Sequence, residues 1–124
     1  RWQKLVWNIP YNGLSVLLRS STAALMGNPD SRALLQALME EVVAAAQACG
    51  HRLPDNYAPK LLAYTDRMPD YLPSMYHDFA GRRPAELPAL YEAPLAAAAA
   101  AGVEMPRVRM LYQTLAFLQR GARP

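Results

Sequence analysis

The chain has 124 residues, 52% of them hydrophobic, which is enough to form one domain around a single core. One cysteine excludes an intramolecular disulfide, and the absence of a Cys/His cluster excludes a zinc site, so we expect an intracellular, cytoplasmic protein without a bound metal. The longest apolar run, residues 94–103, is far shorter than the roughly 18 residues of a membrane span, which excludes a transmembrane protein.

The charge is mildly basic, with 13 Lys and Arg against 10 Asp and Glu, for a formal net charge of +3. These charges are scattered, and the only adjacent basic pair is Arg82-Arg83. No basic run is interleaved with aromatic residues, so the pattern does not favour nucleic-acid binding. A mildly anionic small molecule fits the charge equally well.

The first segment, residues 2–19, has a helical pattern that Pro10 and Gly13 should kink or interrupt. Because the chain begins at Arg1 directly inside this pattern, we expect it to be a piece of a longer protein. No segment of the chain shows the alternation of a half-buried strand. The sequence therefore predicts an all-α domain over residues 1–124.

The clearest helix begins after Asn28, where a capping residue is followed by Pro29 at the first helical position and by an acid near the positive helix end. Apolar residues then recur at helical spacing as far as Gly50, where a helix would stop. The rest of the chain predicts a loop and four further helices, at 51–57, 59–67, 74–82, 86–101 and 106–120. The alanine run at 96–101 favours a tightly packed structural helix.

Lys4, Asn8 and Asn12 are four residues apart, so on a helix they form one polar stripe. Asparagines are poor helix formers, but they suit a ligand that needs both hydrogen-bond donors and acceptors. An alternative interpretation stays open, in which Asn12-Gly13 is a turn and Lys4 is an ordinary surface lysine.

A second polar group follows Pro73. Ser74 is placed to cap a helix or to face a cleft, Asp78 and Arg82 are spaced as an i, i+4 ion pair, and Glu86 stands near a helix start. None of these features is specific alone. The chain also lacks a nucleophile elbow, a metalloprotease motif, a P-loop and a glycine-rich dinucleotide turn, and Cys49 is interpreted as buried filler.

Taken together, the motifs are more specific. The run Lys4-Leu5-Val6-Trp7-Asn8 with Asn12, then Ser74-Met75-Tyr76-His77-Asp78 leading to Arg82 and Glu86, and finally Gly102-Val103-Glu104-Met105-Pro106, resembles the C-terminal domain of the ketopantoate reductase (2-dehydropantoate 2-reductase) family. The resemblance covers nearly the whole chain. It implies an all-helical fold similar to the C-terminal domain of 6-phosphogluconate dehydrogenase.

The resemblance also implies a function in pantothenate biosynthesis, as the substrate-binding and dimerisation half of an NADPH-dependent reductase of ketopantoate or a related 2-keto acid. The N-terminal Rossmann domain that binds most of the NADPH is absent from this chain, so we expect the chain alone to be inactive. By resemblance, Lys4 is the catalytic residue, Asn8, Asn12 and Ser74 bind substrate, and Glu86 lies beside the cofactor. These roles agree with the chemistry, because hydride addition to a ketone builds negative charge on oxygen that an ammonium stabilises.

Four departures from the family pattern put the substrate in doubt: Ala85 for a threonine, Thr22 and the segment before Ser74 where asparagines are frequent, and Tyr91-Glu92-Ala93 where a glycine is usual. A related branched 2-keto acid stays open as substrate. Two other functions stay open as well. One is a non-catalytic helical dimerisation or interaction module derived from the same fold, and the other is a basic nucleic-acid binder.

Overall fold

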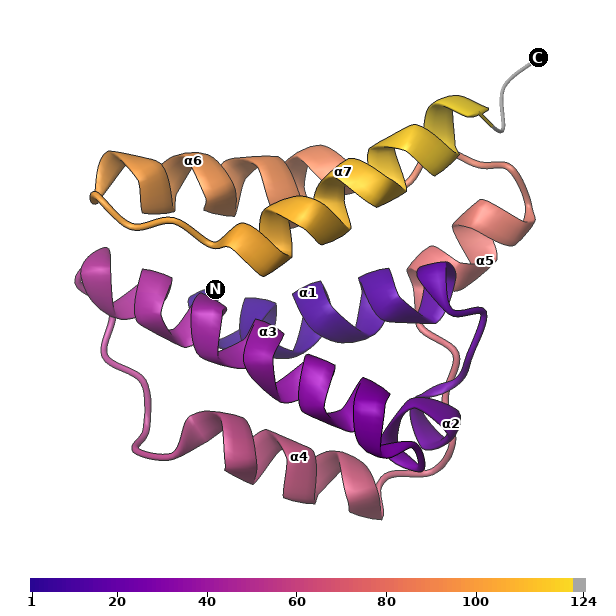
Figure 1. Ribbon diagram of the computed structural model, residues 1–124, viewed down its shortest axis with the longest axis horizontal. Coiled ribbons are helices and arrows are strands. Elements are labelled where there is room, and N and C mark those ends of the chain that lie inside the picture. The colour runs from indigo at the N-terminus through magenta and orange to yellow at the C-terminus, as the bar shows by residue number, and fades with distance from the viewer. Residues whose placement is uncertain (122–124) are drawn as a thin grey trace.

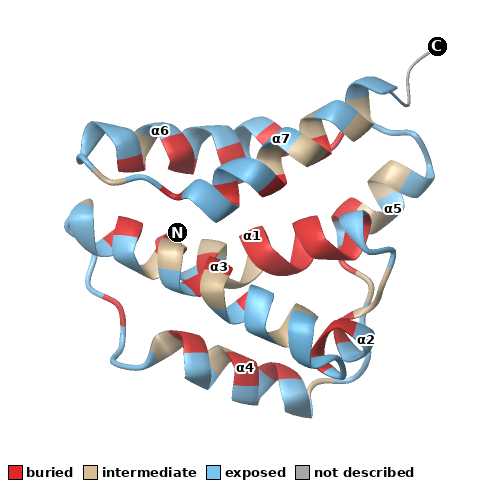
Figure 2. Ribbon diagram, viewed as in Figure 1, coloured by how far each residue is buried: buried red, intermediate tan, exposed pale blue. Residues whose placement is uncertain are grey.

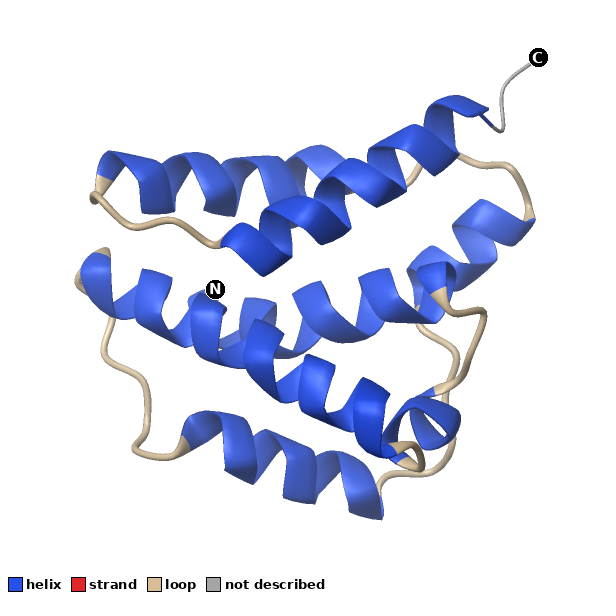
Figure 3. Ribbon diagram, viewed as in Figure 1, coloured by secondary structure: helices blue, strands red, loops and turns tan. Residues whose placement is uncertain are grey.

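The computed structural model describes residues 1–121, and the predicted domain end at residue 124 lies outside them. Within the described part every regular element is a helix, so the all-α prediction is confirmed (Figure 3). The elements in chain order are α1 (Trp2–Leu17), α2 (Thr22–Met26), α3 (Pro29–Ala48), α4 (Tyr57–Arg67), α5 (Ser74–Ala80), the π-helical η1 (Pro88–Glu92), α6 (Ala93–Ala100) and α7 (Pro106–Gly121).

The helices are arranged around α1, which packs against α3, α5 and α7. Figure 1 shows α6 and α7 on one side of the α1 and α3 pair and α4 on the other, with α2 and α5 at one end. Every residue from Ile9 to Val16 is buried, so the C-terminal half of α1 is surrounded by the core (Figure 2). The described residues thus enclose one continuous hydrophobic core.

The first helix is not interrupted at Pro10 and Gly13, because α1 continues through both residues, so that part of the expectation was wrong. Pro10 has no N–H to donate to the helix ladder, and glycine is a weak helix former. Both residues are buried. Tertiary packing around this segment therefore outweighs its local preference.

Gly13 is required by a close approach of two helices to α1. A Cβ atom added to Gly13 would lie 2.5 Å from the Tyr91 hydroxyl and 2.6 Å from Leu111 Cδ2. The Tyr91 hydroxyl donates a 2.6 Å hydrogen bond to the carbonyl of Ile9, in the turn just before Gly13. The tyrosine and α7 can reach the backbone of α1 only because residue 13 has no side chain.

The helix after Asn28 is confirmed. The Asn28 side chain accepts hydrogen bonds from the amides of Asp30 (2.8 Å) and Ser31 (3.4 Å), with Pro29 at the first helical position. Such a cap pairs amides that have no partner inside the helix.

The start of α7 is capped from another helix. Glu41 of α3 accepts hydrogen bonds from the amides of Arg107 (3.0 and 3.1 Å) and Val108 (3.0 Å). Its side chain is only 12% exposed. A carboxylate at this position suits the positive end of α7 and fixes that end against α3.

Several elements differ from the sequence prediction, most of them by one or two residues at a boundary. The short helix α2 was not predicted, α5 ends at Ala80 rather than residue 82, and the expected helix at 86–101 is divided into η1 and α6. The π-helical turn leads into Pro94, which has no N–H for an α-helical bond to the carbonyl of Leu90.

Within residues 1–121, no helix combines the length and apolar character needed to cross a bilayer, and no group of three His, Cys, Asp or Glu side chains is placed to hold a metal ion.

Substituting Gly13→Ala should destabilise the fold despite the better helix propensity of alanine. Overpacking typically costs about 1–3 kcal/mol, against a propensity gain of about 1 kcal/mol. Urea denaturation of the two proteins would measure the change in the free energy of unfolding. Gly121→Ala is the matched control, since an added Cβ there meets nothing within 4 Å. Equal stability of Gly13→Ala and the parent would contradict the close approach.

Candidate functional site

The polar stripe predicted from sequence exists. Lys4, Asn8 and Asn12 all lie on the uninterrupted helix α1, so they share one slowly drifting face. The alternative of a turn at Asn12-Gly13 is wrong, because both residues are helical. Lys4 is exposed, Asn8 is half-buried and Asn12 is buried, so the stripe runs from solvent into the core.

Asn12 connects α1 to α5. Its side-chain oxygen accepts a 3.4 Å hydrogen bond from the backbone amide of Met75, and its side-chain nitrogen donates a 3.0 Å hydrogen bond to the carbonyl of Asn8. The Met75 amide is in the first turn of α5, where helix amides lack partners of their own. Asn12 therefore fixes the start of α5 beside the middle of α1.

One interpretation of the sequence was that Ser74 caps α5, and this was wrong. The helix begins at Ser74 itself, the preceding residue Pro73 is the cap position, and no side-chain capping bond is made there. Ser74 is exposed, next to the amide that Asn12 holds. The structure thus brings Asn8, Asn12 and the Ser74 end of α5 together, while Lys4 lies about 6 Å further along the axis of α1.

The segment that leads into α5 is held by α2. The Thr22 amide donates to the carbonyl of Tyr71 (2.9 Å), and the Tyr71 amide donates back to the Thr22 hydroxyl (3.1 Å). Asp70 accepts a 3.0 Å hydrogen bond from the Ala23 amide, and this bond contributes most to lowering the pKa of the Asp70 carboxyl. The residues that make these bonds are 47 to 49 positions apart in the sequence. No local pattern could therefore have revealed this support of the segment before Ser74.

Glu86 is not joined to the stripe. It is exposed and precedes η1, where its carbonyl accepts from the Leu90 amide. The expected Asp78–Arg82 pair was also wrong. Arg82 has a positive φ of 56°, which ends the helical geometry, and Asp78 instead contacts Arg83 at 3.4 Å.

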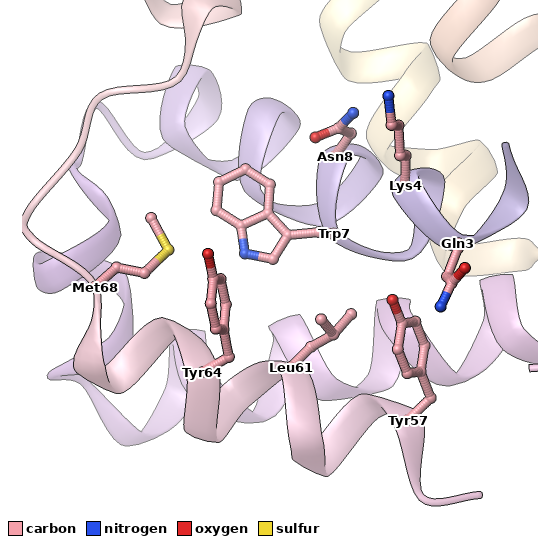
Figure 4. Close-up of a pocket in the computed structure, with 8 residues that line it drawn as sticks. All are labelled: Gln3, Lys4, Trp7, Asn8, Tyr57, Leu61, Tyr64 and Met68. Carbon is pink, nitrogen blue, oxygen red and sulfur yellow. The ribbon is translucent and has the colours of Figure 1, made fainter. Parts of the chain in front are cut away.

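A groove that sequence reasoning missed lies beside Lys4 and Asn8, between α1 and α4 (Figure 4). Its volume is about 460 Å³, within the range of small-molecule sites. Figure 4 shows Tyr64 of α4 pointing toward Trp7 of α1 across the groove. The sequence did contain a pointer to it, since Trp7 stands inside the Lys4–Asn8 motif.

Cys49, predicted to be buried filler, is half-buried, and its Sγ lies 3.5 Å from the carbonyl oxygen of Ala97. It lies at the C-terminal end of α3, as its C-cap residue. The thiol therefore contributes to packing between α3 and α6.

Comparison with known proteins identifies the family. The model of the family described as "Ketopantoate reductase PanE/ApbA C terminal" matches residues 1–119. The chain is 45% identical over 118 residues to a 2-dehydropantoate 2-reductase of a Nostoc species, a match that covers 95% of this chain and 37% of the relative.

Solved structures agree. The crystal structure of 2-dehydropantoate 2-reductase from Geobacter metallireducens is 42% identical with a TM-score of 0.88, and the match covers 99% of this chain and 40% of that one. The corresponding structure from Methylococcus capsulatus is 32% identical with a TM-score of 0.93, covering 100% of this chain and 40% of that one.

The chain thus spans about two-fifths of the length of these relatives. The family match covers both α1 with its polar stripe and α5 with Ser74. On this agreement of sequence and fold, the chain belongs to the family of ketopantoate reductase C-terminal domains.

Proposed function

We propose that this chain is the substrate-binding half of an NADPH-dependent reductase that acts on ketopantoate or a related 2-keto acid. The observation that carries the proposal is the unbroken helix α1, which carries Lys4 and Asn8 on the same face as Asn12, the residue that holds the start of α5. The relatives named above are 2-dehydropantoate 2-reductases, and about three-fifths of their length lies outside the match with this chain.

Lys4 is the proposed catalytic residue. When a hydride reaches the carbonyl carbon of a 2-keto acid, negative charge develops on the carbonyl oxygen. The exposed Lys4 ammonium would donate a hydrogen bond to that oxygen, stabilise the charge and then transfer a proton, which yields the hydroxyl of the product. None of the three ion pairs among residues 1–121 includes Lys4, so no described carboxylate neutralises it.

Asn8, Asn12 and Ser74 are the proposed substrate-binding residues. Asn8 and Ser74 would orient the carboxylate and hydroxyl groups of the acid through their amide and hydroxyl. Asn12 already uses its oxygen and one N–H internally, so it contributes one remaining N–H. Its larger contribution is to hold Ser74 in place.

The cofactor would be bound mainly by a separate Rossmann domain, and when bound it supplies the hydride. In this chain the exposed polar stripe fits a substrate, whereas the sequence has no glycine-rich turn to bind a pyrophosphate. Glu86 is the residue proposed to lie beside the cofactor. It is exposed and stands apart from the stripe, so such a contact would come from the side of η1.

A second role, homodimerisation, is favoured by the outer face of α7. Met110 and Phe117 are 71% and 74% exposed and lie two turns apart on one side of that helix. Exposed apolar side chains at this spacing are typical of a helix that packs against a partner. The structure of a dimeric ketopantoate reductase from Staphylococcus aureus has the same fold, at 26% identity and a TM-score of 0.88.

The first prediction is that the isolated chain folds but neither turns over nor binds NADPH tightly, because the site for the pyrophosphate is missing. Circular dichroism should show a helical protein, and calorimetric titration should show no micromolar affinity. A micromolar dissociation constant for NADPH would contradict the proposed division between two domains.

The second prediction concerns Lys4 in a chimera that joins this chain to the nucleotide-binding part of the Nostoc relative. Lys4→Ala should lower kcat by about 10²–10³-fold, as removal of an oxyanion donor does, with little change in KM. Steady-state NADPH oxidation measures both constants. Asn8→Ala and Ser74→Ala should act mainly on KM, since their contacts are present before the reaction.

In the same assay, Lys60→Ala is the matched control, because Lys60 is an exposed lysine of α4. A near-normal kcat in Lys4→Ala would mean that Lys4 is an ordinary surface lysine, and it would favour the alternative of a non-catalytic interaction module.

The third prediction is that the isolated chain associates in solution. Light scattering should give a mass near twice that of the chain at high concentration, and Met110→Glu should shift it to the monomer, because a charge in an apolar interface is costly. A monomer at every concentration would contradict a dimer formed through α7.

A further inference from the structure

The groove between α1 and α4 continues directly from the polar stripe. Gln3, Lys4 and Asn8 form its polar edge, and the remaining lining residues are apolar or aromatic: Trp7, Tyr57, Leu61, Tyr64 and Met68. Figure 4 shows Trp7, Leu61 and Tyr64 facing one another from the two helices, while the Lys4 and Asn8 side chains extend from α1 away from α4. A ligand held at Lys4 therefore has an apolar surface immediately beside it.

The floor of the groove is fixed before any ligand arrives. The Trp7 indole N–H donates a 3.0 Å hydrogen bond to the Thr65 hydroxyl, which donates in turn to the carbonyl of Leu61 at 2.7 Å. One face of the indole stacks on Tyr11, with ring centroids 4.4 Å apart and planes 20° apart. A side chain held by a hydrogen bond and a stacking contact offers its remaining surface at little cost in conformational entropy.

The opposite side of the groove, formed by α4, is also attached to the core. Arg32 of α3 makes a two-pronged pair with Asp66 of α4, both N–O distances being 2.9 Å. The hydrogen bond from Arg32 lowers the pKa of the Asp66 carboxyl, so the pair persists at neutral pH. This exposed pair adds to the packing of α4 against α3, so Tyr64 stands on a helix that is already attached to the core.

The charge of the lining also restricts the ligand. Among the described residues that line the groove, Lys4 is the only charged one. The complementary ligand carries one anionic or polar end for Lys4 and Asn8 and an apolar body for the aromatic wall. A small, hydroxylated acid would leave the aromatic side chains of the groove exposed to water, whereas a longer apolar substituent would cover them.

We propose that this groove binds the side chain of the keto acid and makes the site selective for 2-keto acids with a branched or aromatic substituent. The inference rests on the proposed function, because it places the keto group at Lys4. Tyr64 and Leu61 then determine specificity from α4, a helix that carries none of the residues implied by the family motif. A pocket of this kind discriminates by about 10-fold or more for each methylene it covers.

The test is a titration of this chain with phenylpyruvate, 4-methyl-2-oxopentanoate and pyruvate, followed by nuclear magnetic resonance. The two larger acids should shift the indole N–H resonance of Trp7 and bind at least about 10-fold more tightly than pyruvate. The Trp2 indole serves as an internal reference, since Trp2 lies against His51, outside the groove.

Tyr64→Ala is the diagnostic variant, because Tyr64 is 58% exposed and its removal should leave the fold intact. It should weaken the two larger acids several-fold and leave pyruvate unchanged. Leu34→Ala is the matched control, an exposed apolar side chain removed from α3, and should change neither. Equal affinity for all three acids, or no effect of Tyr64→Ala, would overturn the proposal.

Three further outcomes separate this inference from the proposed function. If the chimera needs Lys4 for turnover but Tyr64→Ala leaves kcat/KM unchanged for every acid, the groove proposal fails alone. If joining the nucleotide-binding part shields the Trp7 indole without any acid present, the groove is a domain interface and the proposal is overturned. If Tyr64→Ala changes binding but Lys4→Ala keeps full turnover, the proposed function fails instead.

Discussion

The constraint on which the structure depends is that one helix, α1, is both the centre of the core and the carrier of the site. The Tyr91 hydroxyl reaches the Ile9 carbonyl at 2.6 Å across the face that Gly13 leaves bare. Trp7 is bound to Thr65 of α4. With these faces occupied and Asn12 committed to α5, the remaining polar face of α1 is the one that presents Lys4 and Asn8.

The departure at Tyr91 is explained by this packing. The family pattern has a small glycine near this position of the helix, and here a large aromatic residue is fully buried. Burial raises the pKa of the Tyr91 hydroxyl, so it stays protonated and keeps donating to Ile9. Tyr91 thus fills the space beside α1 that Gly13 leaves open, so this residue contributes to the core.

The sequence could predict what depends on neighbouring residues. The cap at Asn28 and the apolar periodicity after it located α3, and the four-residue spacing placed Lys4, Asn8 and Asn12 on one face. It did not predict α2, although the helix has a local cap, the Ser21 side chain that accepts from the Ala24 amide. The other support of its start comes from Tyr71 and Asp70, nearly fifty residues away. The wrong partner for Asp78 has a local cause, the positive φ of Arg82, which periodicity does not reveal.

The same distinction applies inside the site. From their spacing, Lys4, Asn8 and Asn12 look equivalent. In the structure, however, the Asn12 side chain is already hydrogen-bonded to two backbone groups. Asn12 is buried, and its displacement would leave the Met75 amide and the Asn8 carbonyl without their side-chain partner. In the proposed function, a ligand would therefore meet an α5 terminus that is already fixed, and its contact with Ser74 would depend on the hydrogen bond between Asn12 and the Met75 amide.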